Sequence, residues 1–166
     1  YIRGKFVSRK IEDILEEAKM LASKGIKELI VIAQDTTKYG VDIYGEPKLV
    51  ELLQKLSKIQ GIEWIRFLYS YPEGITKDLI QEVKENKKIA KYFDIPIQHI
   101  SDNVLKMMNR KTTRKDIQNL IQDIRKEISD VVLRTSLIVG FPGETKDDFE
   151  QLLNFVKTAK FDKLGA

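Results

Sequence analysis

The sequence predicts an α/β fold in which helices and parallel strands alternate along 166 residues. Short apolar runs rich in β-branched residues recur between longer stretches that carry a helical apolar stripe, and Gly25 and Gly61 close two of those stretches. Strands that alternate with helices of roughly 10 to 16 residues favour repeated βαβ units with right-handed crossovers. Periodicity alone leaves open whether the strands form an open doubly wound sheet or part of a barrel.

The first half of the chain supplies two such units. A helix is expected over 11–24, where every third or fourth position is apolar. Residues 29–33 form a short continuous apolar run, which predicts a strand buried on both faces as parallel sheets require. A helix over 48–59, a strand over 64–69 and a helix over 78–86 follow.

The second half repeats the alternation, with a strand at 92–97, a helix at 113–128 and a strand at 131–139. Thr145 opens a further helix that runs to about residue 160, and Asp148 three positions later resembles a capping box. Residues 161–166 look like the start of another strand.

Composition limits the possible classes of function. The net charge is +4, from 29 Lys and Arg against 25 Asp and Glu, and no apolar run reaches the 18 or so residues of a membrane span. Tyr1 begins no secretory signal, so we expect a cytoplasmic protein without membrane contact. The densest basic stretch, Lys106 to Lys115, either contacts phosphate or is a solvated helix end and loop. The absence of cysteine excludes a disulfide scaffold and a thiolate metal site within these residues.

Polar clusters follow the first two strands, at the ends where α/β folds place functional residues. Residues 33–40 read AQDTTKYG, and helix capping by Asp35 or Thr36 accounts for part of this cluster only. Tyr69 and Tyr71 follow the second strand, where they either stack on a ligand or pack as half-buried groups.

Two further clusters follow the next strands. Gln98 and His99 are candidates for hydrogen bonds to a polar ligand, although a lone histidine is more often structural. With no second histidine and no cysteine, His99 predicts no metal site. The stretch 138–145, IVGFPGET, fits neither the P-loop nor the dinucleotide fingerprint. It is either a loop that approaches a ligand or a tight strand-to-helix turn.

Five separated stretches resemble the radical S-adenosylmethionine (SAM) domain of the methylthiotransferase family. They are YIRGKFVSRKIEDI (1–14), AQDTTKYG (33–40), DIPIQHIS (94–101), MNRKTT (108–113) and IVGFPGET (138–145). The resemblance implies one core domain over 1–166, a partial (β/α)₆ TIM-like barrel with parallel strands, truncated at both ends. We expect the first strand and the cluster-binding cysteine loop to be missing upstream and the last βα unit to be incomplete. The open sheet edges should lower stability or favour association.

The cofactors that the resemblance implies are SAM and [4Fe–4S] clusters. The family holds one cluster with a C-x₃-C-x₂-C motif directly before the stretch that matches residues 1–14, and all six expected cysteines are absent here. We therefore expect the three thiolates just upstream of Tyr1, no metal ligand within the chain, and no radical chemistry by this polypeptide alone.

The resemblance also assigns candidate roles. The implied SAM-binding residues are Gln34, Gln98, His99, Arg134, Ser136 and Gly140. The implied substrate-side residues are Asp35, Thr36, Tyr39 and Tyr71. A guanidinium matches a carboxylate in fork geometry, which suits Arg134 to the carboxylate of SAM, although a structural ion pair is its alternative role.

The family has two substrate branches. The run Asp35-Thr36-Thr37 resembles the branch that adds a methylthio group to the β-carbon of an aspartate in a small-subunit ribosomal protein. The other branch modifies an adenosine of tRNA. A cluster-free module that binds SAM or RNA is an alternative of a different class, and an unrelated phosphate-binding barrel enzyme is a third.

Overall fold

The computed structural model describes residues 4–166, which divide into two compact units. The first unit holds the chain up to Tyr69 together with 77–90, and the second holds 70–76 and 91–166. Each unit is built from parallel strands with helical connections, as the alternating pattern predicts. Within residues 4–166, no helix is long and apolar enough to cross a membrane.

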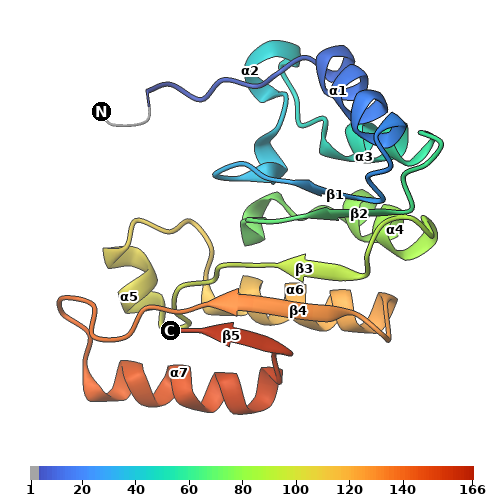
Figure 1. Ribbon diagram of the computed structural model, residues 1–166. Helices are drawn as coiled ribbons and strands as arrows, with labels where there is room; N and C mark the ends of the chain where they lie inside the picture. The colour runs from blue at the N-terminus through green and yellow to red at the C-terminus, as the bar shows by residue number, and fades with distance from the viewer. Residues whose placement is uncertain (1–3) are drawn as a thin grey trace. The chain divides into compact units, whose positions relative to one another are not determined.

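The first unit contains one parallel strand pair and four helices. Its elements in chain order are α1 (Ile11–Ser23), β1 (Glu28–Val31), the 3₁₀ turn η1 (Thr36–Lys38), α2 (Val41–Tyr44), α3 (Leu49–Ser57), β2 (Trp64–Phe67) and α4 (Lys77–Glu85) (Figure 1). The register of the pair runs from Glu28 opposite Trp64 to Val31 opposite Phe67. An isolated parallel bridge joins Ile65 to Ile89.

Helix α1 ends where its sequence predicts. Gly25 has φ 86°, and its N–H donates to the carbonyl of Ala22. The N–H of Ile26 donates to the carbonyl of Leu21, which completes a Schellman motif. The positive φ is the reason that a glycine stands at this position.

The core of the first unit lies between the strand pair and helix α3. The side chains of Leu52, Leu53 and Leu56 from α3 are completely buried against Ile65 and Phe67 of β2 and their neighbours. Burying one such side chain stabilises the fold by about 1.5 to 3 kcal/mol relative to leaving it in water. Helix α3 is therefore held by its apolar stripe, because nine residues are too few for a stable isolated helix.

The second unit contains a three-stranded parallel sheet in the order β3–β4–β5. Its elements in chain order are the 3₁₀ turn η2 (Pro72–Gly74), β3 (Tyr92–Asp94), α5 (Asp102–Met107), α6 (Arg114–Glu127), β4 (Val132–Ser136), α7 (Lys146–Ala159) and β5 (Lys163–Gly165) (Figure 1). Strand β3 is buried along its whole length, and Ile117, Ile121 and Ile124 form the buried stripe of α6.

Two expectations about the strands need correction. The strand at 29–33 does not lie buried on both faces, because Ile30 is 51% exposed, and Trp64 on the paired strand β2 is 60% exposed. Helices α1 and α3 lie on the same side of the β1–β2 pair (Figure 1), and the exposure of Ile30 and Trp64 shows that these side chains are not covered. The strands are also shorter than predicted, and the short helices α2 and α5 were not expected.

Helices α6 and α7 begin with equivalent capping boxes. Thr113 and Asp116 form the box of α6, and Thr145 and Asp148 form that of α7, which confirms the expected helix start. The two differ in their surroundings, because Asp148 also accepts a hydrogen bond from Ser101. That bond, followed by the bonds from Thr145, holds the pKa of the Asp148 carboxyl well below its usual range.

We predict that Asp148→Asn lowers the free energy of unfolding at pH 7 more than the matched variant Asp116→Asn. The lowered pKa of Asp148 adds stability above the unfolded-state value of about 4, and this stability is lost as the pH falls further. Urea unfolding between pH 7 and pH 3 should show a shallower acid decline for Asp148→Asn than for the wild type. Equal effects of the two variants would contradict the prediction.

Candidate functional site

The polar cluster after β1 is largely used to build its own loop. Asp35 caps η1, with its Oδ1 accepting from the Thr37 N–H at 3.1 Å and from the Thr37 hydroxyl at 2.5 Å. Its Oδ2 lies 3.2 Å from Lys38 Nζ. Thr36 is buried, and its hydroxyl donates to the Leu68 carbonyl at 2.9 Å. Helix capping, the alternative interpretation of this stretch, therefore accounts for Asp35 and Thr37.

Gln34 and Tyr39 are the candidate site residues of this cluster that remain accessible, and Lys38 beside them is exposed as well. Gln34 is exposed and Tyr39 is half-buried. The Tyr39 hydroxyl donates to the Arg9 carbonyl at 2.8 Å, and burial raises the pKa of Tyr39 to about 12. Tyr39 is therefore a protonated donor at neutral pH, and it ties the segment before α1 to the loop after β1.

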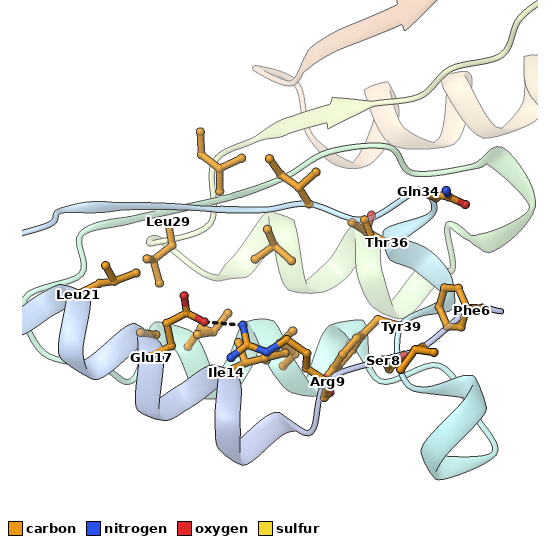
Figure 2. A pocket seen from close by; sticks show the side chains of 18 of the residues that line it. Phe6, Ser8, Arg9, Ile14, Glu17, Leu21, Leu29, Gln34, Thr36 and Tyr39 are labelled. Carbon is orange, nitrogen blue, oxygen red and sulfur yellow. Dashed lines mark hydrogen bonds and ion pairs between the residues drawn. The ribbon is translucent and has the colours of Figure 1, made fainter. Parts of the chain in front are cut away.

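A cavity of about 780 Å³ lies between α1 and β1 in the first unit. Figure 2 shows Leu21 and Leu29 toward one end, and Gln34, Thr36 and Tyr39 toward the other. The ion pair of Arg9 with Glu17 lies along its wall. Consecutive residues 29–34 line the cavity. Side chains of a strand alternate between its two faces, so a cavity that contacts consecutive residues lies along the edge of β1. Within residues 4–166, β1 pairs only with β2.

In the second unit, the backbone turns sharply after β3 at Gln98. The His99 N–H donates to the Ile97 carbonyl at 2.8 Å, which forms a γ-turn with Gln98 at φ 67°. The Gln98 N–H donates to the Ser136 carbonyl at 3.0 Å, and its carbonyl accepts from Ile138 at 2.8 Å. These bonds on both sides hold Gln98 in a conformation that costs a non-glycine residue about 1 to 3 kcal/mol. Its half-buried side chain is thereby fixed beside the end of β4.

The candidate residues on β4 lie in the same part of the second unit. Arg134 Nη1 is 3.4 Å from Oδ1 of the buried Asp94, and the Arg134 side chain is 39% exposed. Ser136 is half-buried two residues further. Gly140 is exposed at φ 78°, with no heavy atom within 4 Å of where a Cβ would lie. The structure thus brings Gln98, Arg134, Ser136 and Gly140 to the carboxyl ends of β3 and β4.

Two predicted residues have other surroundings. His99 is completely buried, and its Nδ1 accepts from the Ser101 N–H at 3.0 Å. Tyr71 is half-buried, and the Arg110 guanidinium lies 4.5 Å from its ring centroid. Such a cation–π contact contributes about 0.5 to 1 kcal/mol at exposed sites. It also ties the basic stretch 106–115 to the segment that follows β2.

Sequence reasoning missed Glu144 and Asp94. Glu144 Oε2 accepts from the N–H groups of Gly140 at 2.7 Å and Phe141 at 3.0 Å. The stretch IVGFPGET contains this carboxylate. Its position four residues after a glycine in a tight turn is the sequence signal that could have predicted its contact with the turn. Asp94 stands in a buried strand, where a lone acid needs a cationic partner.

Comparison with known proteins identifies the family. Residues 1–156 match the model of the radical SAM superfamily. The chain belongs to this superfamily.

Its sequence relatives include ribosomal protein uS12 methylthiotransferases RimO. Those of Alkaliphilus oremlandii and Clostridioides difficile are 65% and 62% identical to the chain over 164 and 165 residues. Each match covers 99% of this chain and 37% of the relative, so the chain spans little more than a third of their length.

Two solved structures share the fold. The radical SAM enzyme coproporphyrinogen III oxidase (HemN) from Escherichia coli matches with a TM-score of 0.58 and 16% identity, over 97% of this chain and 39% of that one. Elp3 from Methanocaldococcus infernus with an N-terminal deletion matches with a TM-score of 0.51 and 12% identity, over 88% of this chain and 38% of that one. These similarities confirm the predicted fold class.

Membership of the radical SAM superfamily implies SAM and an iron–sulfur cluster in general, and the residues present fit them unequally. The chain has no cysteine, and residues 4–166 contain no group of three acidic or histidine side chains that could hold a metal. An iron–sulfur cluster therefore has no ligands here. The second unit fits SAM better, because Gly140 leaves room for a flat ring beside the exposed Ile138 and Val139.

We predict that Gln98→Gly raises the free energy of unfolding by about 1 kcal/mol. The relief of the left-handed backbone outweighs the extra entropy that glycine brings to the unfolded chain. Gln98→Ala keeps the strained φ and serves as the control, with no gain expected. Urea unfolding measures the free energy of unfolding of both variants. If Gln98→Gly is no more stable than Gln98→Ala, the backbone at Gln98 is not strained in the way described.

Proposed function

We propose that this chain is the central part of a longer radical SAM methylthiotransferase that modifies an aspartate of ribosomal protein uS12. The observation that carries the proposal is 60 to 65% identity over 99% of the chain to relatives named as uS12 methylthiotransferases. The transferred group is a methylthio group, and its acceptor is the β-carbon of the aspartate. A cytoplasmic location is part of the proposal, since the substrate is a ribosomal protein.

The domain assignment is part of the same proposal. Residues 1–166 are taken as one core domain whose first strand and cluster-binding cysteines precede Tyr1. The edge of β1 and the adjacent apolar cavity support this, because an unpaired parallel edge is otherwise a site for aggregation. A strand paired there would bury the apolar residues Leu29 and Val31 more completely.

SAM is the proposed ligand of the second unit, where it would supply the radical that abstracts hydrogen once the cluster is in place. Arg134 would bind the SAM carboxylate, with Asp94 holding the guanidinium in position. Gln98 and Ser136 would hydrogen-bond to polar groups of the methionyl and ribose parts. Gly140 would let the adenine approach the backbone at the end of β4.

The first unit supplies the other proposed contacts. Gln34, exposed after β1, would bind SAM as well. Asp35, Thr36 and Tyr39 belong to the substrate side, with Asp35 and Thr36 acting through the loop that they hold together. Tyr71 of the second unit is proposed for the substrate side, where Arg110 stacks on its ring.

We predict that Arg134→Ala in the full-length enzyme weakens SAM binding at least tenfold. A hydrogen bond to a charged group contributes about 1.5 to 3 kcal/mol, which corresponds to a loss of ten- to about a hundredfold. Arg125→Ala is the matched control, because Arg125 also pairs with a carboxylate in this unit, at Asp162. Equilibrium titration with SAM measures both, and an unchanged affinity in Arg134→Ala would remove Arg134 from the site.

We predict that the full-length enzyme, with its clusters assembled, attaches a methylthio group to one aspartate of uS12. Peptide mass spectrometry after incubation with SAM and a reductant measures the product, and uS12 with that aspartate changed to asparagine is the control. Modification of a tRNA adenosine with uS12 left unmodified would favour the other branch of the family. No modification of either, with SAM still bound, would favour a cluster-free binding module.

A further inference from the structure

The buried ring of His99 has a defined orientation. Its Nδ1 accepts a hydrogen bond from the backbone N–H of Ser101 at 3.0 Å, so this nitrogen carries no proton. The proton of the neutral ring is therefore on Nε2. On the other side of Ser101, the hydroxyl donates to the buried carboxylate of Asp148, which itself caps α7. His99 is thus held by the elements that begin α5 and α7.

The Nε2 atom of His99 points at Glu144. It is buried without a hydrogen-bond partner, and Glu144 Oε1 lies 3.6 Å away in a side chain that is only 5% exposed. A buried donor without an acceptor costs about 1 to 3 kcal/mol. A small shift that shortens this separation would satisfy the donor, so Glu144 is its natural acceptor.

The other oxygen of Glu144 faces the loop after β4. Its Oε2 accepts from the N–H groups of Gly140 and Phe141 at 2.7 and 3.0 Å. Further along the loop, a Cβ at Gly143 would lie 2.9 Å from the sulfur of Met107, so the loop also rests closely on α5. A Cβ at Gly140 would have no heavy atom within 4 Å, so apart from its bond to Glu144 this residue faces open space. The side chain of Glu144 is therefore what holds the amides of Gly140 and Phe141, while Ile138 is held by its own backbone bond to Gln98.

Resting on the proposed function, we infer that His99 and Glu144 are a pair of positioning residues for the adenosyl end of SAM. Glu144 holds the amides of Gly140 and Phe141, so that the exposed apolar surface of Ile138 and Val139 is formed before the ligand arrives. His99 holds Glu144 through Nε2. A loop that is already ordered costs less to immobilise on binding, which appears as a higher affinity.

Two substitutions of His99 distinguish the role of Nδ1 from the role of Nε2. In His99→Asn the side-chain oxygen can replace Nδ1 and accept from Ser101, but nothing reaches Glu144. In His99→Gln the longer amide can place its NH₂ near the position of Nε2 and donate to Glu144, while the bond to Ser101 is lost. A merely structural role predicts that both variants suffer alike, whereas the positioning role predicts rescue by glutamine.

The experiment uses the full-length enzyme with its clusters assembled. We expect His99→Asn to speed amide hydrogen exchange in residues 138–143 at least tenfold and to weaken SAM binding about tenfold, with His99→Gln restoring both to within threefold of the wild type. Exchange in β4 must stay slow in every variant, which shows that the fold is intact. Equal effects of the two variants, or none, would overturn the inference.

A second variant tests the pair from the side of Glu144. Glu144→Ala should speed exchange in 138–143 and weaken SAM binding to at least the same extent as His99→Asn, and unchanged exchange would overturn the inference. If the wild type does not bind SAM, the proposed function fails on its own. In that case the exchange rates alone decide whether His99 and Glu144 position the loop.

Discussion

The carboxylate of Asp148 holds together the two loops from which the candidate ligand site of the second unit is built. It accepts hydrogen bonds from Thr145 at the start of α7 and from Ser101 at the start of α5. Ser101 in turn donates to His99, which faces Glu144 and the turn after β4. Because each loop uses the other as a partner, the carboxyl ends of β3 and β4 are fixed as one surface.

Both units use several loop polar groups for internal bonds, and burial limits which of them a ligand could reach. Thr36 bonds to the end of β2, and His99 bonds to Ser101. The accessible candidates are Gln34 and Tyr39 in the first unit, and Gln98, Arg134 and the exposed backbone at Gly140 in the second. The strain at Gln98 fits this division, because strained backbone conformations concentrate at functional sites.

Much of the fold could be predicted from the sequence, because five apolar runs and their glycine or capping signals lie where strands and helix boundaries occur. The capping box at Thr145 and the stop at Gly25 are local chemistry, and local chemistry is visible in sequence. Helices α2 and α5 were missed because four and six residues show no complete apolar stripe. The open face around Trp64 was missed because a continuous apolar run does not reveal which of its faces a helix covers.

The candidate site was only partly predictable. Placing polar clusters after strands correctly located Gln98, Arg134 and Gly140 near one another within the second unit. The approach of His99 to Glu144 brings together side chains 45 residues apart in the sequence, which no spacing rule connects.

Sequencing the coding DNA directly upstream of the codon for Tyr1 decides whether this chain is part of a radical SAM methylthiotransferase. The chain has no cysteine of its own, although the family to which it belongs depends on an iron–sulfur cluster. We expect three cysteines in the spacing C-x₃-C-x₂-C shortly before Tyr1, within a longer reading frame. A start codon there, or an upstream frame without those cysteines, would contradict the assignment of this chain to a radical SAM methylthiotransferase.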